Sequence, residues 1–276
     1  MNKPLLYILF LVAVLLSGCS SGSSWEEEQL EEVSDRLLAD DVTAVWTVKP
    51  DLESSDDPNG DIPATIQLTL KKQDGTPIES FDLNHEKLVH LIVISRDLSY
   101  FNHIHPEYAG EGRFEIQNTF PAGGEYKLIA DFKPSDGDSM TTMEWVTLQG
   151  LSAPSKPVVP DRSLMKTEEG VNVQLDIDNP GVNENTVLTF TLTESSGGEP
   201  ITDLQPYLGA IGHVVIVSED GERYIHVHAE EGQESGPKAV FETSFPSSGV
   251  YKIWAQFQRS DRVFTVPFVI EAEAAS

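Results

Sequence analysis

The sequence predicts an all-β protein built from two tandem β-sandwich domains. Short runs rich in β-branched and aromatic residues recur along most of the chain, separated by Gly, Pro, Asp and Asn, which is the spacing of a sandwich. The pattern occurs twice, with an offset of 123 residues. A Pro/Ser-rich segment, Ser152–Asp161, separates the copies. We therefore expect one sandwich over residues 42–150, a linker over 151–162 and a second sandwich over 163–276.

About seven strands are expected in each copy. In the first copy they cover residues 42–48, 64–70, 88–94, 100–104, 113–120, 124–132 and 143–149, and in the second copy residues 171–177, 187–193, 212–218, 224–228, 239–245, 249–257 and 262–271. The copies also agree in detail, since Tyr126-Lys127 matches Tyr251-Lys252 after a two-residue insertion. This agreement indicates duplication of one domain.

The N-terminus reads as a lipoprotein signal peptide over residues 1–18. It has one Lys and an apolar run, Leu5–Leu16, which is too short for a membrane span and ends in small residues. Leu16-Ser17-Gly18-Cys19 resembles the lipobox of bacterial lipoproteins. The resemblance implies cleavage before Cys19, a diacylglycerol on its sulfur, and anchoring at the extracytoplasmic face of a bacterial cell membrane. The alternative is an uncleaved apolar anchor with a free thiol.

Residues 19–41 form a tether and a spacer. After a short Ser/Gly segment, Trp25–Asp41 carries apolar residues at near-helical spacing with acids between them. This pattern predicts an amphipathic helix. Its acid-rich face argues against lying on a membrane.

Composition excludes several function classes. The formal net charge of −27 disfavours nucleic acid and anionic lipid headgroups, so we expect no nucleic-acid partner and membrane contact only through the lipid. Cys19 is the only cysteine, which excludes an internal disulfide and a blue-copper site. No nucleophile elbow, P-loop or HExxH motif is present, and we expect no enzymatic activity.

Six of the seven histidines fall into two matching sets, one in each copy: His90, His103 and His105, and His213, His226 and His228. Asp220-Gly221 is a preferred type I′ turn, so a hairpin centred there sets His213 opposite His228. Side-chain alternation then adds His226 to the same face. The offset predicts the same arrangement in the first copy, although Asp97-Leu98 is a poorer turn.

Three imidazoles on one hairpin face predict a metal site for Cu(II) or Zn(II) in each copy. Glu107 and Glu230 lie on the same strand face as the His-x-His pairs and are candidates for a fourth ligand or an orienting group. The expected function is metal handling with a membrane metal transporter or an envelope protein as partner. Two alternatives stay open: a structural or interaction module of the cell envelope with structural histidines, and a zinc hydrolase.

One stretch resembles a known signature. Tyr207-Leu208-Gly209-Ala210-Ile211-Gly212-His213, followed by His226-Val227-His228, resembles the YLGAxGH…HVHP signature of bacterial secreted and membrane proteins. The domain is similar to the YtkA-like family, immunoglobulin-like (cupredoxin-like) modules often found near metal-handling proteins, over residues 42–272. The first copy lacks the YLGA element, and Ala229 replaces the usual Pro.

Overall fold

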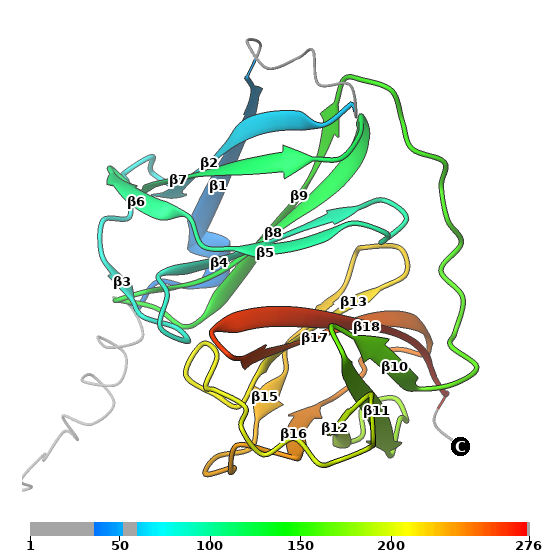
Figure 1. Cartoon of the computed structure of the whole chain (residues 1–276). Helices are drawn as coiled ribbons and strands as arrows, with labels where there is room; N and C mark the ends of the chain where they lie inside the picture. Colours follow the sequence, from blue (N-terminus) through cyan, green and yellow to red (C-terminus); the bar gives the residue numbers. More distant parts are fainter. Residues whose placement is uncertain (1–35, 52–59, 275–276) are drawn as a thin grey trace, which may run out of the picture. The chain divides into compact units, whose positions relative to one another are not determined.

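β-strands dominate the protein, as Figure 1 shows for a computed structural model that describes residues 36–51 and 60–274. These residues contain four antiparallel sheets and one short 3-10 helix, Ala39–Asp41. The predicted all-β class is confirmed. Within the same ranges no helix is long and apolar enough to cross a bilayer. The expected signal peptide and Cys19 lie outside the described residues, so lipidation stays a prediction.

The first sandwich consists of two sheets. Its strands are β1 (Val42–Pro50), β2 (Ile62–Lys72), β3 (Phe81–Asp82), β4 (Val89–Ser95), β5 (Phe101–Ile104), β6 (Glu107–Gly110), β7 (Arg113–Phe120), β8 (Gly124–Pro134) and β9 (Met140–Leu148). One sheet has the order β1-β2-β7-β6. The other has the order β3-β8-β4-β5, and β9 also pairs with β8.

The second sandwich repeats this plan. Its strands are β10 (Met165–Glu168), β11 (Val171–Asp178), β12 (Thr186–Glu194), β13 (His213–Ser218), β14 (Tyr224–Ile225), β15 (His228–Ala229), β16 (Lys238–Thr243), β17 (Gly249–Arg259) and β18 (Arg262–Ala272). The sheet orders are β10-β11-β12-β16-β15 and β14-β13-β17-β18.

Both copies have the immunoglobulin-like strand order. In the first copy, β1-β2-β7-β6 corresponds to strands A, B, E and D, and β9-β8-β4-β5 to strands G, F and C with an added C′ strand. A tyrosine corner marks the start of the F strand in each copy. Tyr126 Oη donates to Ala122 O at 2.9 Å, and Tyr251 Oη donates to Ser247 O at 2.8 Å. The predicted immunoglobulin-like fold is confirmed.

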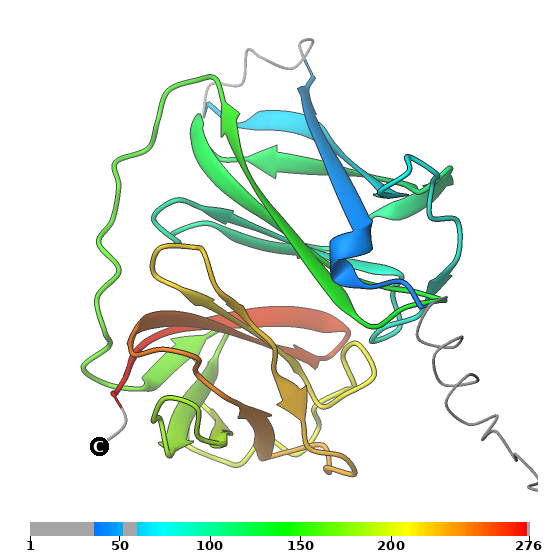
Figure 2. The same ribbon diagram turned by 180° about the vertical axis from the view of Figure 1, so that it is seen from behind.

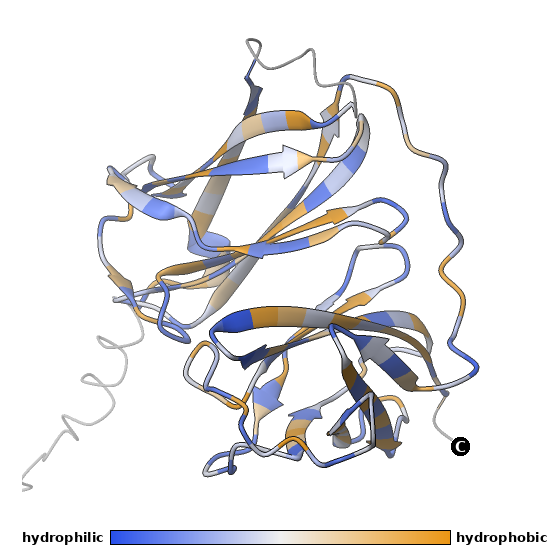
Figure 3. Cartoon of the chain, viewed as in Figure 1, coloured by the Kyte–Doolittle hydropathy of each residue, from blue (hydrophilic) through white to orange (hydrophobic). Residues whose placement is uncertain are grey.

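Burial along the strands reflects how many faces are covered. β2 alternates between buried and half-buried residues because one face packs on the core of its own sandwich. By contrast, β4 is buried from Val89 to Ile94 and β13 from Val214 to Ser218. Hydrophobic and hydrophilic residues alternate along many strands in Figure 3. Continuous burial of β4 and β13 means that both faces of these strands are covered.

The other sandwich covers the second face of β4 and β13. An apolar cluster joins residues of the first copy to residues of the second: Ile92, Ile94, Leu98 and Ile129 to Val215, Val217 and Trp254. The ring of Phe101 stacks on Trp254 with centroids 4.7 Å apart. Most of these residues occupy equivalent positions in the duplication, as Ile92 and Val215 do. Each copy therefore uses the same face of the same sheet for this contact.

Two equivalent lysines link each sandwich to the hairpin turn of the other. Lys127 Nζ lies 2.9 Å from a carboxylate oxygen of Glu222, beside the turn that follows β13. Lys252 Nζ donates to the carbonyl oxygen of Leu98, in the turn that follows β4, at 2.7 Å. These reciprocal contacts fix how the two sandwiches are placed against each other.

The segment between β9 and β10 contains no strand and runs along the outside of the chain (Figure 2). It is nevertheless held at several points, among them a bridge between Gly123 and Ser152. The Lys156 N–H donates to an Asp97 carboxylate oxygen at 2.8 Å, and Val158 packs against the apolar cluster.

The described end of the predicted helix at Trp25–Asp41 is not α-helical. Leu37 is buried and forms a bridge with Gly137, and its N–H donates to Asp136 O at 2.8 Å. Ala39–Asp41 is a 3-10 turn that leads into β1. The helix prediction is wrong for these residues because Leu37 pairs with the first sandwich. The remainder of the predicted helix lies outside the described residues.

Candidate metal centre

The hairpin formed by β4 and β5 carries three histidines. Ile92 pairs with His103, and the same register continued by two residues on each strand sets His90 opposite His105. Because side chains alternate along a strand, His103 and His105 share a face. The register predicted for this copy is confirmed.

The turn of this hairpin forms without a glycine. Ser95 Oγ donates to an Asp97 carboxylate oxygen at 2.7 Å, and the Ser99 N–H donates to the same oxygen at 3.0 Å. Leu98 adopts a φ of 56° and is fully buried in the cluster between the sandwiches. Burial of its side chain compensates for the unfavourable backbone conformation.

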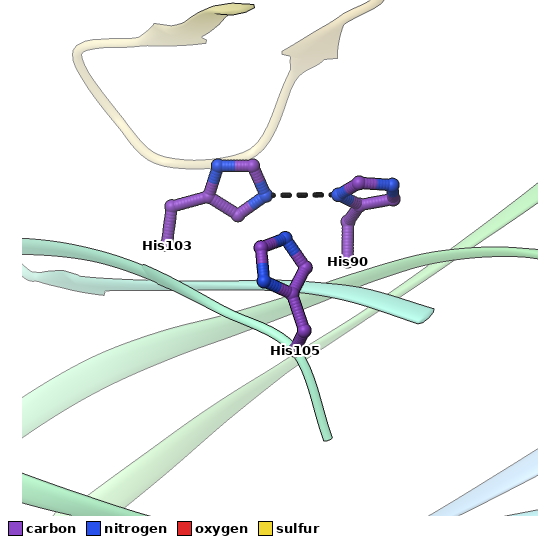
Figure 4. A group of neighbouring side chains, drawn as sticks. All are labelled: His90, His103 and His105. Carbon is purple, nitrogen blue, oxygen red and sulfur yellow. Dashed lines mark hydrogen bonds between the residues drawn. The ribbon is translucent and has the colours of Figure 1, made fainter. Parts of the chain in front are cut away.

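The three rings converge on one point. Ligand nitrogens of His90, His103 and His105 all lie within 4.8 Å of one another. His90 Nδ1 is 3.1 Å from His103 Nε2, and Figure 4 shows the ring of His105 directed at the gap between these two rings. Among the residues that the structure describes, this is the one group of three or more potential ligands at such distances.

His90 and His103 are held from outside through their other ring nitrogens. His90 Nε2 donates to the Asn84 carbonyl oxygen at 2.8 Å, which leaves Nδ1 of the neutral ring with its lone pair. His103 Nδ1 lies 2.7 Å from the side-chain oxygen of Gln256. A proton on Nδ1 leaves Nε2 with its lone pair. In this arrangement two lone pairs face each other.

Burial lowers the pKa of all three histidines. The pKa of His103 falls to about 3 through burial and the neighbouring His90, against the opposing hydrogen bond to Gln256. The pKa of His90 falls to about 4, mainly through burial, and so does the pKa of His105. The rings are therefore neutral at pH 7, which is the form that binds metals.

His213 lies with these histidines and not with those of its own hairpin. Its ring is stacked on that of His90, with centroids 5.6 Å apart and an interplanar angle of 10°, and it lies 4.8 Å from the ring of His103. Strand β14 ends at Ile225, after two residue pairs with β13. His228 then joins β15 in the opposite sheet. The predicted second triad is therefore wrong as a group.

Two ring nitrogens at this place have no hydrogen-bond partner within the described part of the chain. They are His105 Nε2 and His213 Nε2, and both are buried. Burial lowers the pKa of His213 well below its usual value, with further lowering by His103 and His90. Leaving a buried polar atom unpaired costs about 1–3 kcal/mol, so each of these nitrogens calls for an explanation.

The profile of a family described as "Domain of unknown function (DUF8832)" matches residues 47–150 and 166–274, with one match on each sandwich. The chain belongs to the DUF8832 family. No curated protein matches it. The similarity to the YtkA-like family stays a prediction.

Several solved structures are distantly similar to this DUF8832 protein. InvD of Yersinia pseudotuberculosis is 13% identical over 87% of this chain and 59% of its own, with a TM-score of 0.27. The bacterial integrin-binding protein invasin is 12% identical over 82% of this chain and 39% of its own, with a TM-score of 0.23. Domains 4 and 5 of the S-layer protein SbsC are 12% identical over 86% of this chain and 100% of that one, with a TM-score of 0.24. The chain thus spans less than two thirds of InvD and invasin, and these likenesses carry no argument about function.

The remaining histidines of the second DUF8832 copy lie apart from the triad. The rings of His226 and His228 are 4.6 Å apart, and His226 Nδ1 is 3.9 Å from a carboxylate oxygen of Asp131 in the first copy. His228 and His85 line a cavity of about 920 Å³. This pair is open to solvent, whereas the triad is largely buried.

The sequence did not point to His85 or Gln256. His85 occupies a turn with a φ of 46° before β4, and its ring lies 6.1 Å from that of His90. Gln256 comes from the other sandwich, and nothing in its local pattern distinguishes it. The two acids suggested as ligands, Glu107 and Glu230, are exposed and do not belong to the group of close ligands.

Proposed function

We propose that this protein is a lipid-anchored lipoprotein of the extracytoplasmic face of a bacterial membrane that binds Zn(II) or Cu(II) through His90, His103 and His105. The observation that carries the proposal is the outward hydrogen bonding of two of these rings. It directs the lone pairs of His90 Nδ1 and His103 Nε2 toward each other. A cation between them converts a repulsion into two metal–ligand bonds.

The distances support a shared ion. Two imidazole nitrogens bound to one tetrahedral zinc ion, each at about 2.0–2.1 Å, lie about 3.3 Å apart. His90 Nδ1 and His103 Nε2 are 3.1 Å apart. The partners Asn84 O and Gln256 Oε1 match the usual arrangement in which a metal-bound histidine donates its other N–H to an oxygen.

The donor set supports Zn(II) or Cu(II) in particular. Imidazole suits both ions. In the proposed mature chain, Cys19 carries the lipid, so its sulfur is not a ligand. The surplus of acids over basic residues attracts cations to the protein surface. A membrane metal transporter or an envelope protein is the proposed partner, and the role is binding rather than catalysis.

The proposal is tested by titrating metal-free protein, beginning at Ser20, with Zn(II) and Cu(II). We expect one tight site, and we expect His105→Ala to weaken it by about 100-fold because a ligand is lost. His105 makes no hydrogen bond to the other two rings that its removal would disrupt. His228→Ala, which removes an exposed histidine outside the triad, is the matched control and keeps the wild-type affinity. Equal affinities of His105→Ala and wild type would contradict the proposal.

The second candidate function is a non-catalytic structural or interaction module of the cell envelope. The 3.1 Å distance between His90 Nδ1 and His103 Nε2 favours it, because this is also the length of a hydrogen bond between the two rings. If the Gln256 amide is turned over, its NH₂ donates to His103 Nδ1, and His103 Nε2 then donates to His90 Nδ1. The pair is satisfied without an ion in that arrangement. Failure of the wild-type protein to bind either metal would favour this function.

A further inference from the structure

The second sandwich reaches the triad with two neighbouring side chains. His213 on β13 and Gln256 on β17 are direct cross-strand partners, so both side chains leave the same face of one sheet. Gln256 Oε1 lies 2.7 Å from His103 Nδ1. The ring of His213 lies 4.8 Å from that of His103 and 5.6 Å from that of His90.

Gln256 is fixed by its own sandwich. Its side-chain nitrogen is 3.2 Å from Thr265 Oγ1, on the neighbouring strand β18, and the residue is only 5% exposed. In this orientation the amide nitrogen donates to the Thr265 hydroxyl and the amide oxygen faces His103. A buried oxygen in this place selects the tautomer of His103 whose Nε2 is free to bind an ion.

His213 lies beside the triad with a ring nitrogen that is unpartnered in the described part of the chain, outside the group whose ligand nitrogens all lie within 4.8 Å of one another. Its ring therefore has to turn toward the triad to bind the same ion. Its Nε2 is buried and has no hydrogen bond within the described residues, while its neutral ring is stacked on His90. His213 and His90 are equivalent in the duplication, and the packing of the two sandwiches brings them together. The contacts of Lys127 with Glu222 and of Lys252 with Leu98 hold this packing without any metal.

We propose that the second sandwich completes the metal centre, with His213 as a fourth imidazole ligand and Gln256 as the residue that orients His103. A Zn(II) or Cu(II) ion held in this way is bound by side chains of both sandwiches and ties them together. This inference rests on the proposed function of the triad. Four protein ligands give Zn(II) the closed tetrahedral shell of a structural site, so the ion is retained and not offered to a substrate.

The role of His213 is tested by metal titration of the full-length mature protein. His213→Gln keeps a polar side chain of similar size and is expected to weaken Zn(II) binding by about 10- to 100-fold. His213→Ala serves as a second variant, and thermal unfolding without metal checks that both fold. His228→Ala is the histidine control. Binding of Co(II) adds a second measurement, because tetrahedral Co(II) absorbs visible light strongly and the band is expected to weaken in His213→Gln.

The outcomes separate this inference from the proposed function. If His105→Ala loses Zn(II) while both His213 variants bind with the wild-type affinity and the wild-type Co(II) spectrum, His213 is not a ligand and the inference is overturned. The triad then stands alone as the site. If the wild-type protein does not bind metal, the proposed function itself fails.

The positioning role of Gln256 has its own test. Gln256→Leu removes the oxygen that accepts from His103, and we expect Zn(II) affinity to fall by about tenfold or more. Gln256→Glu restores an acceptor oxygen and is expected to recover the affinity. Gln258→Ala, two residues further along β17, is the matched control. Equal affinities of the Leu and Glu variants would overturn this role, because a purely structural residue shows no selective rescue by an acceptor.

Discussion

Asp131 and Gln256 occupy equivalent positions in the two copies, opposite His90 and His213 on neighbouring strands. Both are buried at the contact between the sandwiches. An amide tolerates this environment better than a carboxylate does. Burial raises the pKa of Asp131 to about 6, against an opposing hydrogen bond from the Phe132 backbone. Asp131 is therefore still charged at pH 7, but its charge is less favourable in the folded protein than in the unfolded chain.

Replacing Asp131 by Asn is expected to stabilise the protein at pH 8. Because the folded-state pKa is raised above the ordinary value of 3.8, stability is lost as the pH rises from 3.8 to about 6. Removing the charge is expected to recover about 3 kcal/mol in the free energy of unfolding. Urea denaturation at pH 5, 6.5 and 8 checks this, with Asp176→Asn on the surface as the control. A variant less stable than wild type at pH 8 would contradict the prediction.

Acid is expected to destabilise the metal-free protein. The pKa values of His90 and His105 are lowered to about 4 and that of His103 to about 3, so the unfolded chain binds more protons than the folded protein below pH 6.5. Stability is expected to fall as the pH decreases from 6.5 toward 4, by about 1.4 kcal/mol per pH unit for each buried ring. Protonation of Asp131 stabilises the folded protein as the pH falls, but this one group is opposed by three histidines.

Denaturant midpoints measured at pH 7.5, 6 and 5 in the presence of a chelator test this dependence. His103→Gln removes one buried ring and is expected to flatten the slope. A midpoint that stays constant over this range would mean that the rings have the same pKa in the folded and unfolded protein, which would contradict the prediction.

At the scale of the elements, the two hairpins share a turn design but differ in how the strands continue. Asp97 and Asp220 each accept from a serine hydroxyl and a backbone N–H in the turn. The first turn places Leu98 at positive φ, whereas the second uses Gly221 there. The first hairpin therefore depends more heavily on its aspartate.

Asp97→Ala is expected to destabilise the protein by about 1–2 kcal/mol, and by more than Asp220→Ala does. Burial acts to raise the pKa of Asp97, but hydrogen bonds from Ser95, Lys156 and Ser99 lower it to about 2. Its contribution is thus present above pH 3.8 and is lost as the pH falls toward 2. Thermal unfolding of the two variants at pH 7 makes the comparison. Equal losses would mean that the glycine-free turn does not depend on Asp97.

The turn residues made the registers of the two hairpins predictable. The local sequence did not show where the strands of each hairpin end. The register centred at Asp220-Gly221 is observed where Ile216 pairs with Ile225. Nothing in the pattern shows that β14 ends there and that His228 joins the opposite sheet. The sequence therefore predicted one triad correctly and a second one that does not assemble, because strand switching depends on contacts from distant residues.

At the scale of the whole molecule, the contact between the sandwiches contains the residues that no local pattern could identify. Gln256, Asp131 and His213 gain their surroundings only when the two copies pack together. The immunoglobulin-like class and most of the strands were predictable, because alternation and turn residues are local signals, but the short strands β3, β6 and β10 were not among those predicted. The face through which each copy contacts the other was not predictable. Apolar residues on such a face give the same sequence pattern as apolar residues in the core of a sandwich.

The link between Lys127 and Glu222 is expected to be the most sensitive polar contact between the sandwiches. The Lys127 side chain is 5% exposed, and Trp145 Nε1 also donates to Glu222, at 2.7 Å. Glu222→Ala leaves a buried ammonium without its carboxylate and is expected to cost about 2–3 kcal/mol. Asp136→Ala breaks the exposed contact with Lys72 and is expected to cost less than about 0.5 kcal/mol. Denaturant unfolding compares the two variants, and similar losses would contradict the prediction.

The near-parallel stacking of His90 on His213 places equivalent residues face to face, as a two-fold axis does in a symmetric dimer. Identical subunits would be obliged to present the same groups on both sides of such an axis. Two copies in one chain can differ at equivalent positions. Here the first copy has the acid Asp131 where the second has the amide Gln256. The duplicated motif suggests two ions per chain. Because the two copies differ at the site, we expect one metal ion to be bound per protein chain.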